Sequence, residues 1–280
     1  MAVLTSYSSE DGDYLPEESC ATPGKGFMAT MSSHFTAIGF PVRTAREYWA
    51  LAQRAAQSGS RIASEGGHTL VRWAPGGGPE IWVQTNEAGE ALIATPFFAG
   101  DDSCRIALTG AGPSDHDGFE GWIDGWLNPT EEDEPYSGVF PLRVDLVNYL
   151  AVKQGLSPEA VIAVRLAVIL HDATLYADAR AYEAVRGFSY RPPVQSFASS
   201  IHHGADEPSG DADATALVTG YVTESHELTN VATGATFWWM RIATAGATLS
   251  LVADRGVLPA DPRAGEVLSG SGWVLGEALP

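Results

Sequence analysis

The strongest periodic pattern of apolar and polar residues covers residues 44–58. Thr44 and Glu47 have the spacing of a capping box, in which each side chain bonds the backbone N–H of the other residue. Gly59 follows as a residue that commonly ends helices. The apolar positions between them share one stripe of a helix, at Tyr48, Leu51, Ala52 and Ala55. The pattern predicts an amphipathic helix that packs on one side.

Segments with the composition of strands flank this helix. We expect one strand before it, at 34–42, and three after it, at 68–74, 80–85 and 91–97. The connections between the last three are typical of hairpins, so these strands should be antiparallel. Strand, helix and antiparallel strands in this order favour an α+β unit with the helix on one face of a sheet. Further pieces of this unit are expected at 104–109, 119–127 and 139–147.

Residues 157–177 carry two conflicting signals. Ser157 and Pro158 are typical of a helix start, as the N-cap and the first helical residue. Apolar residues then occupy every second position, at Ile162, Val164, Leu166, Val168 and Leu170. A period of two with β-branched residues favours a strand, so we interpret this segment as one long strand.

The last quarter of the chain is rich in short strand patterns, expected at 215–223, 235–243, 247–253, 266–269 and 272–279. Residues 269–272, Ser-Gly-Ser-Gly, are interpreted as a turn. Three segments carry a resemblance: Val218-Thr-Gly-Tyr-Val222, Leu249-Ser-Leu-Val-Ala253 and Gly265-Glu-Val-Leu-Ser-Gly270. With them, residues 215–279 resemble an OB-fold β-barrel, although the helix that such barrels place between strands three and four is missing or reduced to 259–262. The resemblance implies a small barrel domain.

The strand, helix and strands of the first unit resemble the βαβββ module of the vicinal-oxygen-chelate superfamily. That resemblance implies a divalent metal held by His and Glu side chains, and His34, Glu80 and Glu90 are the matching candidates. Such enzymes usually need two copies of the module, and the region 104–147 shows no second set. The alternative interpretation of His34 is a surface histidine.

Length and composition limit the possible domain organisation. The chain has 280 residues, of which 45% are hydrophobic and 10% aromatic, so it can bury a substantial core. We expect an acidic leader at 1–33, an α+β domain at 34–200, an acidic linker at 201–214 and an OB-like barrel at 215–280. The predicted fold class is therefore α+β, a mixed sheet with a packed helix followed by a small barrel.

The charge is strongly negative but unevenly spread. The chain has 16 Lys and Arg against 35 Asp and Glu, a net charge of −19. Segments 1–33, 101–134 and 206–213 carry −17 of it, and acidic runs of this kind are usually solvated loops. The balance argues against nucleic acid or an anionic membrane surface as a partner.

The start of the chain has neither a basic region nor an apolar region of a secretory signal, and no apolar stretch reaches a membrane-spanning length. Cys20 and Cys104 do not form a disulfide framework. We therefore expect a cytoplasmic location. No phosphate-cradling loop or nucleophile elbow occurs, and we expect no cofactor.

Three further groups of residues contain side chains of the types that bind metals or ligands. Asp115-His116-Asp117 and His202-His203 contain metal-ligand types, but adjacent side chains diverge in an extended chain, so solvated loops are the favoured interpretation. Trp238 and Trp239 are candidate ligand-binding residues that invite base stacking. In a strand, however, their rings point to opposite faces.

The patterned core without a complete catalytic set favours a non-catalytic binding or interaction module for an unknown protein or small-molecule ligand. The alternative is a divalent-metal-dependent enzyme of the vicinal-oxygen-chelate type. A second alternative is single-strand nucleic-acid binding by the OB-like domain.

Overall fold

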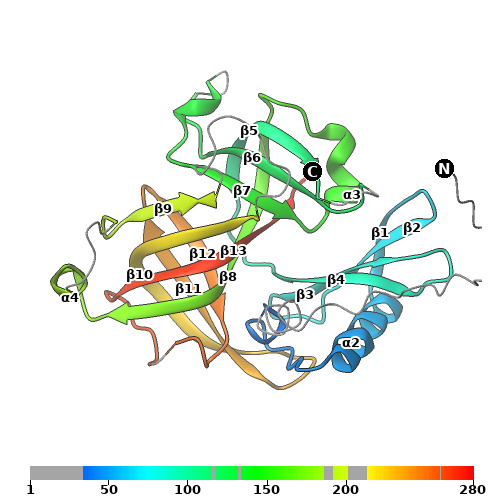
Figure 1. The fold of residues 1–280 in the computed structure, drawn as a ribbon, viewed down its shortest axis with the longest axis horizontal. Helices are drawn as coiled ribbons and strands as arrows, with labels where there is room; N and C mark the ends of the chain where they lie inside the picture. The colour runs from blue at the N-terminus through cyan, green and yellow to red at the C-terminus, as the bar shows by residue number, and fades with distance from the viewer. Residues whose placement is uncertain (1–33, 115–117, 132–133, 186–191, 201–212, 259) are drawn as a thin grey trace, which may run out of the picture.

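The chain folds mainly into β-sheet (Figure 1). The computed structural model describes residues 34–280 except 115–117, 132–133, 186–191, 201–212 and 259. Of the described residues, 51% lie in strands and 15% in helices. The expected α+β class is wrong, because a nine-stranded sheet and a four-stranded sheet dominate and the helices are short. The expected leader at 1–33 and most of the linker at 201–214 lie outside the described residues.

The four-stranded sheet is an antiparallel meander covered by one helix. Its strands are β1 (Ser60–Glu65), β2 (His68–Trp73), β3 (Pro79–Thr85) and β4 (Ala91–Phe98), in that order. Helix α2 (Ala45–Ser58) packs against β2, β3 and β4. Every residue of β3 is buried, because α2 covers one face of the sheet and the other face turns toward the nine-stranded sheet. The expected helix and three strands are confirmed, whereas β1 was missed.

The predicted capping box of α2 is also confirmed. The Thr44 hydroxyl accepts from the Glu47 backbone N–H at 3.2 Å, and the Glu47 carboxylate accepts from the Thr44 N–H at 3.0 Å. Tyr48 anchors the helix to the sheet, since its hydroxyl accepts from the Ala94 N–H at 2.9 Å. Local pattern and tertiary contact therefore agree over this segment.

The expected strand at 34–42 is wrong. Residues 34–36 form a helical turn, and Gly39 has a φ of +76°, which breaks an extended conformation. Two backbone carbonyls of this segment accept hydrogen bonds from side chains, not from a neighbouring strand. Asn230 donates to the Ile38 carbonyl at 2.8 Å, and Thr233 donates to the Gly39 carbonyl at 2.6 Å. The segment is apolar because it is buried between other elements. Composition alone does not distinguish such a buried segment from a strand.

The nine-stranded sheet consists of two similar units of four strands and one added strand. Its strands are β5 (Cys104–Pro113), β6 (Gly121–Leu127), β7 (Pro141–Leu146), β8 (Val161–Tyr176), β9 (Ser196–Ser199), β10 (Thr215–Thr229), β11 (Thr236–Thr244), β12 (Ala247–Ala253) and β13 (Val267–Ala278). The first unit is the antiparallel meander β5-β6-β7 followed by β8, and the second is β10-β11-β12 followed by β13. Strand β9 pairs with the first half of β10.

Each unit completes the other. Strand β5 pairs with β8 and β7 runs parallel to β13, while β10 pairs with β13 and β12 runs parallel to β8. The strands β8 and β13 pair antiparallel with each other from Val164 to Tyr176. Two closed rings result, β5-β6-β7-β13-β8 and β10-β11-β12-β8-β13, which share the β8–β13 ladder. Closure leaves few free strand edges.

This arrangement changes the expected C-terminal barrel. The prediction of a long strand at 157–177 is confirmed as β8, but β8 closes the ring that contains β10, β11 and β12. Strands on both sides of the expected linker therefore share one sheet, and the ring is not built from residues 215–280 alone.

The turn expected at Ser269–Gly272 is wrong, since β13 runs through it without interruption. The two glycines instead allow the backbones of β8 and β13 to lie close together. A Cβ atom at Gly272 would lie 2.7 Å from the Ile169 carbonyl oxygen, and one at Gly270 would overlap the Asp172 carbonyl. Glycine is used here because β8 crosses β13 too closely for a side chain.

Two apolar clusters fill the protein. One lies within the rings, and the other joins α2, the four-stranded sheet and the residues of the rings that face this sheet. Strand alternation divides the ladder between them: Val168 belongs to the first cluster and Ile169 to the second. Ion pairs between side chains also join the two sheets. Glu277 of β13 pairs with Arg165 of β8, and its carboxylate lies 3.7 Å from the guanidinium of Arg72 on β2.

The remaining helices are short and lie on connections. They are the α-helices α3 (Tyr149–Val152) and α4 (Ala179–Ala184) and the 3-10 turns η1 (Pro135–Ser137) and η2 (Lys153–Gly155). Asp178 caps the N-terminus of α4, because its carboxylate accepts from the Ala181 N–H at 2.7 Å. Within the described parts of the chain, no helix has the length and apolarity needed to cross a bilayer.

The β8–β13 crossing gives a test of the fold. We expect Gly272→Ala to lower the free energy of unfolding by about 1–3 kcal/mol, since the new methyl group forces the two strands apart. Gly155→Ala is the matched control: its Cβ would meet nothing within 4 Å, and we expect a change below about 0.5 kcal/mol. Urea unfolding measures both. Equal stability of the two variants would contradict the close crossing.

Candidate functional site

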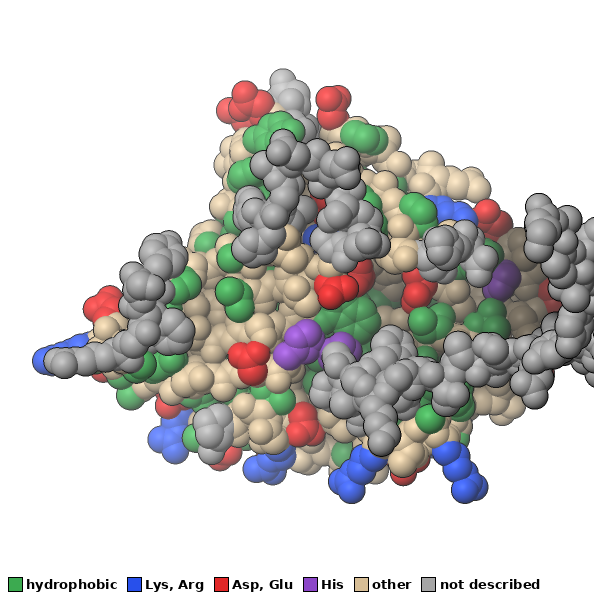
Figure 2. Space-filling model, in the orientation of Figure 1, with side chains coloured by type: hydrophobic (Ala, Val, Ile, Leu, Met, Phe, Trp, Pro, Cys, Tyr) green, Lys and Arg blue, Asp and Glu red, His purple; other side chains and the backbone are tan. Residues whose placement is uncertain are grey.

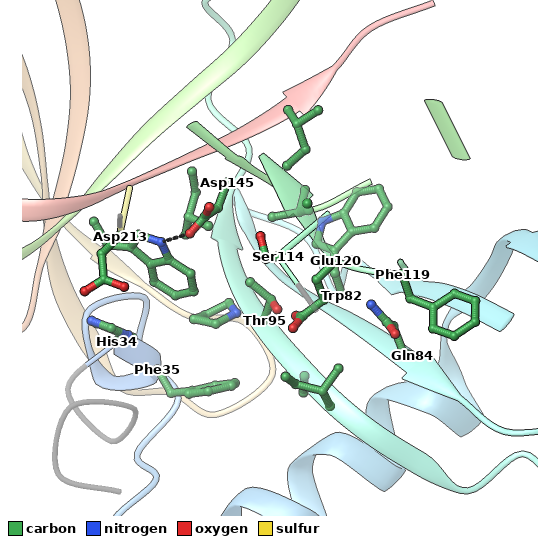
Figure 3. A pocket seen from close by; sticks show the side chains of 18 of the residues that line it. His34, Phe35, Trp82, Gln84, Thr95, Ser114, Phe119, Glu120, Asp145 and Asp213 are labelled. Carbon is green, nitrogen blue, oxygen red and sulfur yellow. Dashed lines mark hydrogen bonds between the residues drawn. The ribbon is translucent and has the colours of Figure 1, made fainter. Parts of the chain in front are cut away.

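A cavity of about 630 Å³ lies between the four-stranded sheet and the edge of the nine-stranded sheet. One side is formed by β2, β3 and β4, and the other by the end of β7 and the middle of β8 and β13 (Figure 3). On the face shown in Figure 2, histidine side chains lie beside acidic and hydrophobic ones, and the Lys and Arg side chains lie mainly toward the lower edge. The site therefore combines residues far apart in the chain.

The best-positioned polar group in the cavity is the carboxyl of Asp145, on β7. The Trp273 indole N–H, on β13, donates to its Oδ2 atom at 2.7 Å. The parallel pairing of β7 with β13 brings the two residues together, since Asp145 is the register partner of Leu275. Strand pairing thus fixes the direction of the carboxyl group.

Burial governs the ionisation of this carboxyl. It raises the pKa of Asp145 from 3.8 to about 6, while the Trp273 hydrogen bond and the charge of Arg143 act in the opposite direction. Arg143 does not pair with Asp145. Its guanidinium donates to both carboxylate oxygens of Asp124, at 2.8 and 2.7 Å, and lies over the Trp122 ring. The carboxyl of Asp145 therefore has no cationic partner of its own among the residues described.

Two histidines lie beside Trp273. The Nε2 atoms of His34 and His171 are 2.8 Å apart, and the ring of His34 is 4.8 Å from that of Trp273. Burial lowers the pKa of His34 to about 4, and His171 acts in the same direction. Burial also lowers the pKa of His171, against the opposing effects of Asp172 and Asp213. Both rings are therefore neutral at pH 7, so one Nε2 atom donates and the other accepts.

The opposite side of the cavity is apolar with a few hydrogen-bonding groups. Trp82 and Gln84 face it from β3, and Thr95 from β4. Ser114 and Glu120, at the ends of the β5–β6 connection, lie near Thr95 in Figure 3. The cavity thus offers aromatic surface together with hydroxyl, amide and carboxyl groups.

The structure does not bring the three metal-ligand candidates together. His34 contacts His171 in the cavity. Glu80 is buried in an ion pair with Arg72, and Glu90 accepts from the Asn86 amide at 2.8 Å on an exposed hairpin. In the described ranges, no group of three or more His, Cys, Asp or Glu side chains is placed to hold a metal ion.

The two tryptophan candidates lie away from the cavity. Trp238 is buried in the cluster within the rings, and Trp239 packs against the other cluster, so their rings take opposite faces of β11 as expected. The ring of His226 stacks on Trp239 at 5.7 Å. Neither tryptophan lines the cavity between the sheets.

Two other predictions lie outside the described residues: the Asp115-His116-Asp117 and His202-His203 groups. The sequence interpretation missed Asp145 and Trp273, which no local motif marks. His171 follows directly after the apolar run of β8 that ends at Leu170. This change from apolar to polar residues within one strand is the one signal that could have pointed to a site.

We compared the chain with protein-family models, curated proteins and solved structures. None of them matches it.

The raised pKa of Asp145 gives a test of the site. Between pH 4 and 6 the folded protein holds a proton that the unfolded chain has lost, so ionisation of Asp145 costs stability as the pH rises through this window. Asn cannot ionise and still accepts from Trp273. At pH 7.5 we expect the free energy of unfolding of Asp145→Asn to be about 1–3 kcal/mol higher than that of the wild type. This difference should shrink toward pH 4.

Urea unfolding at several pH values measures this difference. Glu183→Gln, at an exposed carboxylate on α4, is the control and should change stability by less than about 0.5 kcal/mol at every pH. A destabilised Asp145→Asn variant at pH 7.5 would show that the carboxylate stabilises the fold and would overturn this view of the site.

Proposed function

We propose that the protein binds a small organic molecule in the cavity between its two sheets. The observation that carries the proposal is the cavity itself, whose volume of about 630 Å³ lies within the range of small-molecule sites. Its lining combines aromatic surface with a few directed polar groups, as such sites do. The sequence favours a binding module for a protein or a small molecule, and we propose the small molecule.

The elements around the cavity support binding by a preformed site. Strands β3, β4, β7, β8 and β13 each contribute lining residues, and each pairs on both sides or packs against another layer. Side chains on paired strands are held more precisely than side chains on loops. The hydrogen bonds of Trp273 to Asp145 and between the two histidines further fix the lining. Little ordering is then required when a ligand binds.

A ligand screen by thermal unfolding tests this function. We expect some small molecules to raise the melting temperature by a few degrees at saturating concentration, because a ligand that binds only the folded state stabilises it. Thr95→Phe fills the cavity from β4 and should abolish these shifts. Leu217→Phe, at an exposed position on β10, should retain them.

Stabilising molecules that act equally on the wild type and on Thr95→Phe would bind elsewhere and contradict the proposal. A broad screen in which no molecule stabilises the wild type would contradict it as well.

A further inference from the structure

We propose that the cavity selects a cationic ligand, an amine or ammonium group attached to an aromatic or apolar body. This inference rests on the proposed binding function and specifies the chemistry of the ligand. It is carried by the charges of the lining, by the hydrogen bonding of Asp145 and by the aromatic surface around it.

All charged side chains that line the cavity are acidic. They are Glu120, Asp145 and Asp213, and the lining includes no Lys or Arg among the residues that the structure describes. Two basic groups close to lining residues, Arg143 and Lys153, bond to other groups. Arg143 is bonded to Asp124, and the Lys153 ammonium lies 3.1 Å from Glu65 and donates to the Gly118 carbonyl. An anionic ligand would therefore meet only carboxylates, whereas a cation would be attracted.

Asp145 keeps one acceptor atom for a ligand. Trp273 donates to Oδ2, and no other described residue donates to this carboxyl group. Burial disfavours the ionised form of this carboxyl group, as its raised pKa indicates. A ligand ammonium within hydrogen-bond distance of Oδ1 would supply the missing partner, and a charge-assisted bond of this kind is strong when water is excluded.

The aromatic lining suits the rest of such a ligand. Trp82, Phe35, Phe119 and Trp273 contribute ring surface to the same cavity. Aromatic faces attract cations as well as apolar groups, and Trp is the most favourable of them. A bicyclic ring with a short amine chain fits comfortably within about 630 Å³.

The neighbouring histidines do not oppose a cation at neutral pH, since both are neutral there. The charged or titratable groups that act on Asp145 are Arg143, Asp213 and Asp124, while His34 and His171 lie across Trp273. As the pH falls below about 6, Asp145 takes up a proton and its attraction for a cation is lost. Affinity for a cationic ligand should therefore decrease from pH 7.5 to pH 5.

Three probes of nearly equal shape test the charge of the ligand: tryptamine, tryptophol and indole-3-propionate. They share the indole ring and two-carbon chain and carry an ammonium, a hydroxyl and a carboxylate group. By isothermal titration calorimetry at pH 7.5, we expect tryptamine to bind about tenfold or more tightly than tryptophol, and indole-3-propionate to bind weakest. At pH 5 only the affinity for tryptamine should fall.

Asp145→Asn separates charge recognition from shape. We expect it to reduce tryptamine affinity about tenfold and to leave tryptophol affinity unchanged, while Glu183→Gln alters neither. An equal loss for both probes would show that Asp145 only shapes the cavity and would overturn the inference.

Two other outcomes also overturn it. If tryptophol or indole-3-propionate binds as tightly as tryptamine, and Thr95→Phe abolishes that binding, the cavity function stands and the ligand class is wrong. If tryptamine does not bind at millimolar concentration, the amine class is wrong. The cavity function would still be supported by any molecule from the thermal screen whose melting-temperature shift is abolished in Thr95→Phe.

Discussion

The antiparallel pairing of β8 with β13 is the constraint on which the rest of the structure depends. Both rings of the nine-stranded sheet close through this ladder, so neither unit of four strands is complete without the other. Alternation along the ladder sends Val168 and Val274 into the ring interior, and Ile169 and Leu275 toward the four-stranded sheet. One pair of strands thus holds together two rings and the interface with the second sheet.

The candidate site follows from the same ladder. His171 and Trp273 lie on β8 and β13, and Asp145 lies on β7, which runs parallel to β13. The four-stranded sheet, covered on its other face by α2, then encloses the cavity. Burying a carboxyl group there costs stability, as its raised pKa indicates. A carboxyl group that has no cationic partner among the described residues is typical of a site at which a protein retains function at a cost in stability.

The sequence predicts those elements whose cause is local. The capping box and apolar stripe predict α2, alternation predicts β8, and hairpin connections predict β2, β3 and β4. It does not predict which distant strands pair. His34 and His171 are 137 residues apart, and the glycines of residues 269–272 have the composition of a turn although they permit two strands to cross closely. Close approach and long-range pairing leave no periodic signal, so the site could not be assembled from the sequence.

The most direct test of this account is an NMR titration of the Asp145 side-chain carboxyl carbon, with and without saturating tryptamine. The account predicts a pKa near 6 in the free protein and a clear decrease toward 3.8 when tryptamine is bound, because a cation binds the ionised carboxyl in preference to the neutral one. A pKa near 3.8 in the free protein, or one near 6 that tryptamine leaves unchanged, would contradict it.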